Sequence, residues 1–452
     1  MQYPPNIFKA YDIRGESPGE ITPEFAERLG RVFPGFTGAK TVVVGRDARQ
    51  TSPDMADALI RGITSQGVDV IDIGMVSTPM FYFAVGEYEL HDAGIMVTAS
   101  HNPAKYNGFK LVRGDVFPIG AASGMNELRD IVCGTREFPD LKEGNVVISD
   151  ISDEYLEKVF SLADPENLKQ FNLAVDNGNG MGGVILPRLL KSIPGWNSGI
   201  FMDPDGRFPN HEANPLKEET LSELKKLLKE KKSDLGVAFD GDADRIGFID
   251  ENGEAVPGDL IAAVIAPRIL EVYPGSPVLL DVRASWAAHE AVREAGGIPK
   301  LSLVGHANFK KLLRESGACF GGEVSMHYYY RDFYDGMESG DLTLLILLSI
   351  MTDTGKKLSE LVAPHKKYFH SGEINFEVEN KAGAISNIEK KYGAEAKEII
   401  RLDGLKMEFK DWWVSLRASN TEPLLRLNLE AKTKEKMEEM REEISQIIKH
   451  KA

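Results

Sequence analysis

The sequence contains little cysteine, with only Cys133 and Cys319 among its 452 residues. Two cysteines so far apart form neither a disulfide framework nor a metal site of the usual spacing. We therefore expect two buried thiols in a reducing compartment. The first residues also lack the basic and apolar regions of a secretory signal. These absences together predict a cytoplasmic protein.

Long hydrophobic runs and an excess of basic residues are absent as well. The longest apolar stretch, residues 342–351, is far shorter than the roughly 20 residues that a membrane-spanning helix needs, so no membrane association is expected. The 53 Lys and Arg residues are outnumbered by 69 Asp and Glu residues, which leaves a formal charge of −16. Nucleic acid is therefore excluded as the main partner, because phosphate-backbone binding requires a basic face. Local basic pockets can still bind small anions.

Three stretches of the chain share one pattern: an apolar β-branched run, a polar loop and then a helical period. The apolar runs and their loops are residues 42–49, 173–180 and 278–283, and the helical segments that follow them are residues 53–65, 184–190 and 286–295. Short buried strands that alternate with helices indicate parallel or mixed sheets. Because the three stretches lie about a hundred residues apart, they predict three related α/β domains.

The C-terminal part follows a different pattern. It has strand-like segments at residues 373–378, 412–416 and 424–429, and helical segments at 382–391 and 433–449. This order predicts a smaller α+β domain. We place the domain boundaries near residues 148, 252 and 367, which divides the chain into residues 1–147, 148–251, 252–367 and 368–452.

An acidic motif, Asp-Gly-Asp-Ala-Asp-Arg at residues 240–245, follows the strand-like residues 235–239. Alternate residues of an extended or tightly turned backbone project to one side, so the three carboxylates converge. Converging carboxylates repel one another unless a hard dication neutralises them, and oxygen ligands suit Mg²⁺ or Ca²⁺. An EF-hand is excluded, because the sixth loop position requires glycine and is Arg245 here. The remaining alternative to a metal site is a solvated acidic turn.

A second motif, Thr-Ala-Ser-His-Asn-Pro at residues 98–103, follows the apolar residues 93–97. A serine at the end of a strand, followed by His101 and a proline that restricts the turn, is positioned to expose its hydroxyl. Neither glycine of the G-x-S-x-G elbow is present, so the α/β-hydrolase arrangement is excluded. Lys110 adds a cation ten residues later. A Ser-His pair alone is more often part of a turn than of a catalytic site.

Two further loops have the composition of anion-binding or sugar-binding sites. Residues 417–423, Arg-Ala-Ser-Asn-Thr-Glu-Pro, offer a guanidinium, hydroxyls and an amide between two strands, and such a turn can bind phosphate. Residues 321–327, Gly-Gly-Glu-Val-Ser-Met-His, place Glu323 and Ser325 at alternate positions. A plain β-turn and an exposed acid are the structural alternatives for these two loops.

Taken together, these loops resemble the motifs of the α-D-phosphohexomutase family, specifically its phosphomannomutase/phosphoglucomutase group. The likeness covers nearly the whole chain, from residues 9–15 to residues 417–423, and the serine and acidic motifs in this order are highly specific. The resemblance implies three related mixed α/β domains and a smaller C-terminal α+β domain around a central active-site cleft. Each domain would contribute one loop to that cleft.

The resemblance also implies a reaction and a set of functional residues. Ser100 would carry a phosphoryl group as phosphoserine, and a hexose 1,6-bisphosphate would be the intermediate between hexose 1-phosphate and 6-phosphate. Mg²⁺ would be held by a phosphoryl oxygen on Ser100 together with Asp240, Asp242 and Asp244. His101, Lys110 and Arg245 would complete the catalytic group, with the general base open between His101 and Lys110. Substrate-binding positions would be Tyr11, Arg14, Lys310, Glu323, Ser325, His327, Arg417, Ser419, Asn420 and Thr421.

One position departs from the pattern of the group. The sugar-binding loop of the family usually reads Gly-Glu-x-Ser-Gly-His, and this chain has Met326 where that glycine stands. Val324 favours mannose and glucose phosphates, while Met326 leaves the choice of sugar open. The alternatives are a phosphoglucosamine mutase, a phosphosugar-binding protein without turnover, and a phosphatase. The oligomeric state is not predicted by the sequence.

Overall fold

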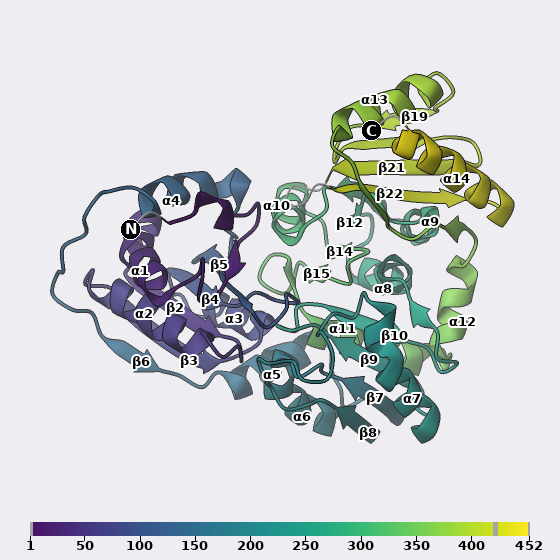
Figure 1. Ribbon diagram of the computed structural model, residues 1–452. Helices are drawn as coiled ribbons and strands as arrows, with labels where there is room; N and C mark the ends of the chain where they lie inside the picture. Colours follow the sequence, from purple (N-terminus) through teal and green to yellow (C-terminus); the bar gives the residue numbers. More distant parts are fainter. Residues whose placement is uncertain (1–2, 419–423, 451–452) are drawn as a thin grey trace.

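The structure is a computed structural model that describes residues 3–418 and 424–450. It contains four β-sheets, each built from one of four successive parts of the chain, which we call domains I to IV. Figure 1 shows domain I in purple beside domains II and III in teal and green, with the yellow domain IV packed on domain III. The predicted architecture of three mixed α/β domains and a C-terminal α+β domain is confirmed.

Domain I has a six-stranded sheet in the order β1-β5-β4-β2-β3-β6. Its strands are β1 (Ile13–Glu16), β2 (Thr41–Arg46), β3 (Asp69–Met75), β4 (Ala93–Val97), β5 (Tyr106–Arg113) and β6 (Val146–Ile148), and its helices are α1 (Pro23–Thr37), α2 (Ser52–Thr64), α3 (Thr78–Gly86) and α4 (Met125–Val132). Helices α1 and α2 cross closely at two glycines. A Cβ on Gly30 would stand 2.3 Å from the carbonyl oxygen of Leu59, and one on Gly62 would stand 2.2 Å from that of Glu27.

Domains II and III each have a five-stranded sheet, in the orders β11-β10-β9-β7-β8 and β13-β12-β14-β15-β16. Domain II contains β7 (Phe171–Asp176), β8 (Gly195–Ile200), β9 (Leu235–Phe239), β10 (Ile246–Ile249), β11 (Ala255–Val256), α5 (Ser152–Leu162), α6 (Leu186–Leu189) and α7 (Ser222–Lys231). Domain III contains β12 (Pro277–Asp281), β13 (Ile298–Ser302), β14 (Phe320–Gly322), β15 (Tyr328–Tyr330), β16 (Met337–Glu338), α8 (Gly258–Val272), α9 (Trp286–Glu294), α10 (His306–Ser316), α11 (Gly340–Thr354) and α12 (Leu358–Val362).

The first three domains share one strand arrangement. In the orders β3-β2-β4-β5, β8-β7-β9-β10 and β13-β12-β14-β15, three parallel strands are followed by one antiparallel strand. The loop between the last parallel strand and the antiparallel strand is equivalent in all three domains. It comprises residues 98–105, 240–245 and 323–327. Three of the four predicted functional loops therefore leave the carboxyl end of a parallel strand, where α/β sheets generally bind ligands.

Domain IV is built on an antiparallel sheet in the order β17-β22-β21-β20-β19, with β18 also paired to β22. Its elements are β17 (Phe369–His370), β18 (Ile374–Glu377), β19 (Glu398–Ile400), β20 (Leu405–Glu408), β21 (Trp412–Ala418), β22 (Leu424–Ala431), α13 (Lys381–Tyr392) and α14 (Lys434–His450). The strands and helices that the sequence predicts for this part are all present. The fourth predicted loop connects β21 to β22, and its residues 419–423 lie outside the described residues.

Two local predictions need correction. The single helix predicted for residues 184–190 is wrong, because α6 is four residues long and is flanked by 3₁₀ turns. Gly183 allows a close approach to the carbonyl oxygen of Met202, 1.9 Å from where a Cβ would stand, and Ile193 is extended because it precedes a proline. Of the two cysteines, Cys319 is buried as expected, but Cys133 is only half-buried.

The sheets also bear on the domain boundaries. β6 pairs with β3 through Ile148, and β11 pairs with β10 through Val256. A strand that is hydrogen-bonded into a sheet belongs to the domain of that sheet. We therefore propose the first boundary after Ile148 and the second after Val256, and we keep the third near residue 367.

The hydrophobic core extends across the first three domains. Helix α3 is apolar on every side and its residues 78–85 are all buried, as expected for a helix that lies between packed layers. Its side chains join one cluster with those of α5 and α11, whereas domain IV has a separate core. Helix α11 contains the longest apolar stretch of the sequence and has 15 residues. None of the described helices has the length and apolar character to span a bilayer.

A buried carboxylate in this core makes stability depend on pH. Asp341 of α11 is fully buried and accepts a hydrogen bond from Tyr155 of α5 at 2.5 Å. Burial raises the pKa of Asp341 to about 6 from an ordinary value of 3.8. A raised pKa contributes stability that is fully present below the unfolded pKa and is lost as the pH rises through about 6. Relative to Asp341→Asn, the wild-type free energy of unfolding should therefore fall by about 2–2.5 kcal/mol between about pH 4 and pH 7.

Urea unfolding of both proteins across this pH range measures the difference. Asparagine at position 341 can still accept the hydrogen bond from Tyr155 but does not titrate, so it isolates the charge. A difference between the two proteins that does not change with pH would contradict the assignment.

Candidate active site

The serine of the first motif lies at the end of a buried strand. Ser100 follows β4 by three residues, has a backbone φ of +50° and is 2% exposed. Its Oγ donates a hydrogen bond to Oδ2 of Asp240 at 3.0 Å and lies 3.2 Å from Nδ1 of His101. A left-handed conformation costs about 1–3 kcal/mol for a residue other than glycine, and such strain clusters at functional sites. The loop thus holds the serine hydroxyl against the acidic motif of domain II.

Arg49 fixes the backbone of residues 98–105, which we call the serine loop. Its side chain is buried and is paired with Asp47 at 3.1 Å. The guanidinium donates hydrogen bonds to the carbonyl oxygens of Ser100 (2.8 Å), Asn102 (2.6 Å), Pro103 (2.8 Å) and Tyr106 (2.9 Å). Because one buried cation binds four carbonyls of the loop, the position of Ser100 is set by the end of β2.

The three aspartates of the second motif form a buried cluster. Each has a carboxylate oxygen within 4.8 Å of the other two. A Cβ on Gly241 would stand 2.4 Å from the carbonyl oxygen of Ser100, so glycine is needed for the acidic loop and the serine loop to pack this closely. Lys110 of β5 faces the cluster, with its Nζ 2.6 Å from Oδ2 of Asp242 and also paired to Asp244.

The pKa values of Asp240 and Asp244 are shifted in opposite directions. Burial, followed by the charges of Asp244 and Asp242, raises the pKa of Asp240 well above its ordinary value. Burial acts in the same direction on Asp244, but Lys110 and His327 outweigh it and hold the pKa of Asp244 well below its ordinary value. The pKa of Lys110 is raised, because the two aspartates outweigh the effect of burial.

The cluster fits a hard metal ion. Three carboxylates are buried together, and burial and their mutual repulsion raise the pKa of Asp240 even though Lys110, Arg245 and His327 lie nearby. Oδ1 of Asp242 is buried and has no hydrogen-bond partner among the residues that the structure describes. An all-oxygen donor set of this kind suits Mg²⁺ or Ca²⁺. The solvated acidic turn is excluded, because all three side chains are buried.

Arg245 and His101 complete the surroundings of the cluster. Nε of Arg245 lies 3.8 Å from Oδ2 of Asp240 and 3.2 Å from Nε2 of His327. Burial, followed by the charge of Arg245, lowers the pKa of His101 well below its ordinary value. The structure therefore brings Ser100, His101, Lys110 and Arg245 together around the three aspartates.

Residues 323–327 of domain III, which we call the sugar loop, lie against the aspartate cluster. His327 is buried, with Nε2 3.3 Å from Oδ1 of Asp244 and Nδ1 3.1 Å from both Oε2 of Glu323 and Oγ of Ser325. Burial lowers the pKa of His327, but Asp244 outweighs it and raises that pKa to about 9. Burial alone would raise the pKa of Glu323, but the hydrogen bond from His327 outweighs it and lowers that pKa to about 2.

Two of the predicted substrate-binding residues are not open to the cleft in this conformation. Glu323 is fully buried, and its carboxylate accepts hydrogen bonds from the backbone N–H of Gly305 at 2.8 Å and from the hydroxyl of Tyr329 at 2.6 Å. Lys310 is also fully buried, with its Nζ 2.8 Å from Glu338 and 2.7 Å from the hydroxyl of Tyr82. Ser325 remains half-exposed.

Tyr11 and Arg14 extend the site from domain I. Arg14 donates hydrogen bonds to Asp12 and to Oδ1 of Asn102, both at 2.7 Å, and so lies beside the serine loop. The hydroxyl of Tyr11 donates to the carbonyl oxygen of Val304 in domain III at 2.8 Å.

Arg417 of β21 is the predicted substrate-binding residue of the fourth loop that the structure describes. Its guanidinium lies 3.6 Å from Glu373 and 3.8 Å from Asp403. Nε of Arg417 is buried and has no hydrogen-bond partner among the described residues. Asp403 accepts a hydrogen bond from the backbone N–H of Val304, which places domain IV next to the Tyr11 contact. Ser419, Asn420 and Thr421 lie outside the described residues.

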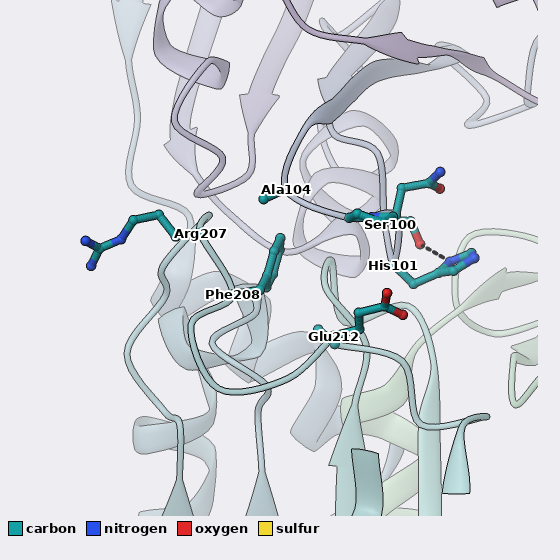
Figure 2. A pocket seen from close by; sticks show the side chains of 9 residues that line it. Ser100, His101, Ala104, Arg207, Phe208 and Glu212 are labelled. Carbon is teal, nitrogen blue, oxygen red and sulfur yellow. Dashed lines mark hydrogen bonds between the residues drawn. The ribbon is translucent and has the colours of Figure 1, made fainter. Parts of the chain in front are cut away.

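A cavity of about 190 Å³ lies beside Ser100 (Figure 2). Residues 100–104 of the serine loop line one side of it, and Arg207, Phe208, Glu212 and Ala213 of domain II line the other. Figure 2 shows Phe208 and Glu212 turned toward the serine loop and Arg207 pointing away from it. The space next to the serine is therefore open although its side chain is almost fully covered.

Family models match all four domains of the chain. The models for the α/β/α domains I, II and III and for the C-terminal domain of phosphoglucomutase/phosphomannomutase match residues 5–136, 153–253, 257–368 and 373–447. The chain belongs to the phosphoglucomutase/phosphomannomutase family. It is 38% identical over 446 residues to the phosphohexose mutases of Xanthomonas campestris pv. campestris strain B100, covering 98% of this chain and 99% of that protein. It is 39% identical to the phosphomannomutase of Vibrio cholerae, with 98% of each chain covered.

Two solved structures have the same fold as this chain. A phosphoglucomutase/phosphomannomutase family protein from Burkholderia thailandensis superposes with a TM-score of 0.89 at 33% identity, covering 99% of this chain and 97% of that one. The N-acetylphosphoglucosamine mutase of Aspergillus fumigatus, crystallised with GlcNAc-6P and magnesium, superposes with a TM-score of 0.63 at 14% identity, covering 99% of this chain and 95% of that one. The second likeness concerns the fold alone.

Met326, which departs from the sugar-loop pattern of the phosphohexomutases, has the backbone conformation of a glycine. Its φ is +69°, in the left-handed region that favours glycine. The side chain is 8% exposed and belongs to the core shared by the first three domains. Its Sδ would stand 3.0 Å from a Cβ on Gly247 of β10, beside Pro215. The extra side chain therefore packs into the core, and the left-handed turn of the loop is kept.

We expect Met326→Gly to affect stability more than substrate binding. The variant removes a buried side chain, which costs about 2–5 kcal/mol, and relieves a left-handed strain of about 1–2 kcal/mol, so unfolding should become easier by about 1–3 kcal/mol. The KM for hexose phosphates should change less than about threefold, because the removed side chain is buried in the core. Urea unfolding and steady-state kinetics measure the two effects. Met326→Ala, which keeps the strain, should be no more stable than Met326→Gly, and a KM change without a stability change would contradict this account.

Sequence reasoning missed the residues that support the phosphohexomutase loops from below. Arg49 holds the serine loop, and Asp281 accepts a hydrogen bond from the backbone N–H of Val324 in the sugar loop at 2.9 Å. In domain II, the backbone N–H of Met181 donates to the carbonyl oxygen of Gly241 in the acidic loop at 2.9 Å. A signal for them exists, because each of the three apolar runs ends at or next to an aspartate: Asp47 directly follows β2, and Asp176 and Asp281 are the last residues of β7 and β12. The loops that begin there follow the central parallel strand and lie beside the functional loop of the same domain.

Proposed function

We propose that this chain is a phosphohexomutase that interconverts the 1-phosphates and 6-phosphates of mannose and glucose. Its relatives of similar length are named phosphohexose mutases and phosphomannomutases, which supports this activity and mannose as a sugar, and the matching family model names phosphoglucomutase as well. The observation that carries the proposal is the contact between Ser100 and Asp240. The backbone of Ser100 is in the left-handed region, and its hydroxyl is held against a buried carboxylate cluster.

In the proposed cycle, Ser100 starts as phosphoserine. The bond between phosphorus and Oγ breaks while a bond forms between phosphorus and the free hydroxyl oxygen of a hexose phosphate, which gives a hexose 1,6-bisphosphate. The bisphosphate then reorients within the cleft, so that its other phosphate faces Ser100, and returns that phosphoryl group to Oγ. The phosphoserine is restored, and the phosphate of the sugar has moved from one hydroxyl to the other. Added hexose 1,6-bisphosphate serves as activator, because it phosphorylates any free Ser100.

Asp240, Asp242 and Asp244, together with an oxygen of the phosphoserine, would hold Mg²⁺. When bound there, this ion neutralises charge on the transferred phosphoryl group. Lys110 and Arg245 add fixed positive charge on the same side of the site. The hexose hydroxyl loses a proton in this step and Oγ gains one as the phosphoryl group leaves. His101 lies within reach of Oγ, so we propose that it takes up and delivers this proton, whereas Lys110 is engaged by two carboxylates.

The remaining predicted residues would bind the sugar phosphate. Arg14, Tyr11, Ser325 and His327 would face the sugar phosphate from domains I and III. Glu323 and Lys310 would act by holding their neighbours in place, since both are buried and paired. Arg417 would bind the phosphate that is not being transferred, with Ser419, Asn420 and Thr421 as its expected partners. The small-molecule partners are therefore hexose phosphates. A cytoplasmic location is supported by the two cysteines, neither of which forms a disulfide.

A comparison of three sugars by phosphorus NMR tests the proposal. Mannose 1-phosphate, glucose 1-phosphate and glucosamine 6-phosphate are each incubated with the enzyme, Mg²⁺ and a catalytic amount of the matching bisphosphate. We expect conversion of the mannose and glucose phosphates to their isomers at comparable rates. Conversion of the glucosamine phosphate alone would identify the chain as a phosphoglucosamine mutase, and steady release of inorganic phosphate would indicate a phosphatase.

A further inference from the structure

A groove lies in domain II at the opposite end of its strands from the acidic loop. Its volume is about 560 Å³, and it is lined by Gln170, Asn172, Gly195, Trp196, Ser198, Lys231 and Ser233, which together we call the Trp196 groove. Figure 1 shows β8 and α7, which contribute to it, at the lower margin of the molecule. The amino ends of β7 and β8 form its floor, while the acidic loop follows the carboxyl end of β9, a strand parallel to β7. The groove is therefore separated from Ser100 by roughly 15 Å of strand.

The sheet geometry explains why this space is open. Trp196 of β8 is the register partner of Asn172 on β7, and Ser198 is two residues further along β8, so all three side chains lie on one face of the sheet. Leu224 and Leu228 of α7 pack on Ala174 and Ala238 in the inner strands. The helix ends at Lys231, which leaves the outer strand β8 uncovered at its amino end.

The groove presents an aromatic face to solvent. Trp196 is 66% exposed, whereas the other three tryptophans of the chain are buried or half-buried. Nζ of Lys231 lies 5.6 Å from the centre of the Trp196 ring. Burying an exposed indole releases more apolar area than almost any other side chain, so a tryptophan left exposed in a groove is a strong attachment point for a ligand.

The polar side chains around the ring are free to bind. Ser233 is 4% exposed, and its Oγ has no hydrogen-bond partner among the described residues. A buried hydroxyl without a partner costs about 1–3 kcal/mol, and a ligand or a water molecule in the groove removes that cost. The side chains of Gln170, Asn172 and Ser198 likewise make no hydrogen bond within the described part of the chain. Amide and hydroxyl groups beside a flat aromatic face match the hydroxyls and the C–H face of a pyranose ring.

The charge of the groove favours a neutral ligand. Lys231 is its only charged residue, and the chain as a whole carries a formal charge of −16. A phosphorylated sugar would therefore meet one lysine in a repulsive field, whereas the active site offers several cations to such a ligand. We propose that the Trp196 groove binds the pyranose rings of a neutral oligosaccharide, separately from the active site. The ring stacks on Trp196, Asn172 and Gln170 bind its hydroxyls, and Ser233 donates or accepts the hydrogen bond that it lacks within the chain.

Fluorescence titration with maltose and α-1,6-mannobiose tests this site. The titration is made with the active site filled by hexose 1,6-bisphosphate, so its result does not depend on the proposed mutase activity. We expect a saturable change of tryptophan emission with a Kd of about 1–10 mM. Trp196→Ala should abolish it, and Ser233→Ala should weaken binding by about fivefold or more. Ser222→Ala, at the exposed start of α7, should leave binding unchanged, and Trp196→Ala should retain full mutase turnover.

Three results would overturn the proposal. The first is the absence of saturable binding up to about 50 mM of either disaccharide. The second is binding that survives Trp196→Ala when followed by saturation-transfer NMR, which does not depend on tryptophan emission. The third is a dimer in sedimentation that Trp196→Ala dissociates, because the groove would then be a contact between two copies of this chain.

Discussion

Replacing Ser100 with alanine is expected to lower the turnover of mannose and glucose phosphates by at least about 10³-fold, because the covalent acceptor of the phosphoryl group is lost. The hydroxyl makes two contacts, with Asp240 at 3.0 Å and with His101 at 3.2 Å, and the side chain is buried. The fold should persist, since the loop backbone is held mainly by Arg49 through hydrogen bonds to carbonyl oxygens that the substitution leaves in place. A coupled assay with either sugar phosphate measures the loss.

The matched control is a second serine of the same cleft. Ser325 belongs to the sugar loop, where its Oγ lies 3.1 Å from Nδ1 of His327. Ser325→Ala should raise the KM by less than about tenfold and leave kcat within about tenfold of the wild type, because it removes one binding contact and no covalent step. Turnover in Ser100→Ala comparable to that in Ser325→Ala would contradict a phosphoserine mechanism.

Replacing Asp242 with asparagine should make activity depend on much higher Mg²⁺ concentrations. Asp242 accepts a hydrogen bond from Thr78 at 2.7 Å and an ion pair from Lys110 at 2.6 Å through Oδ2, while its Oδ1 has no partner among the described residues. Asparagine keeps the shape but removes one of the charges that attract the ion. We expect the Mg²⁺ concentration for half-maximal activity to rise by about 10–100-fold, with a lower kcat at saturation.

Chelation provides an independent readout for the same site. Removal of divalent ions from the wild type should abolish turnover, and added Mg²⁺ should restore it. Asp353→Asn, an exposed carboxylate paired with Arg268, should behave like the wild type. Full activity of the wild type in the presence of excess chelator would show that the aspartates serve another purpose.

Much of the site follows from local sequence, because its motifs are short and contiguous. The serine, the three aspartates and Arg245 lie within two six-residue stretches, and strand-like residues precede both. The pattern also predicts three related domains, since the apolar runs that form β2, β7 and β12 are strong signals. In each sheet these strands lie next to β4, β9 and β14, and the functional loops begin at the ends of those neighbouring strands.

The remaining features depend on contacts between distant residues, which no local pattern encodes. Arg49 binds carbonyls more than fifty residues away, and Lys110 reaches the aspartates from another domain. The burial of Glu323 beneath the sugar loop depends on Tyr329 and on the backbone of Gly305. Met326 shows the same limit, because its sequence suggests an altered sugar pocket, whereas its buried position places the extra side chain in the core.

The phosphorylation state of Ser100 directly tests the phosphoserine mechanism. The enzyme is treated with hexose 1,6-bisphosphate and Mg²⁺, analysed by intact-mass spectrometry and peptide mapping, and then mixed with excess mannose 6-phosphate. We expect one added phosphoryl group per chain, mapped to Ser100, which disappears as mannose 1,6-bisphosphate is formed. An enzyme that turns over hexose phosphates while Ser100 remains unmodified, or while another residue carries the group, would contradict that mechanism.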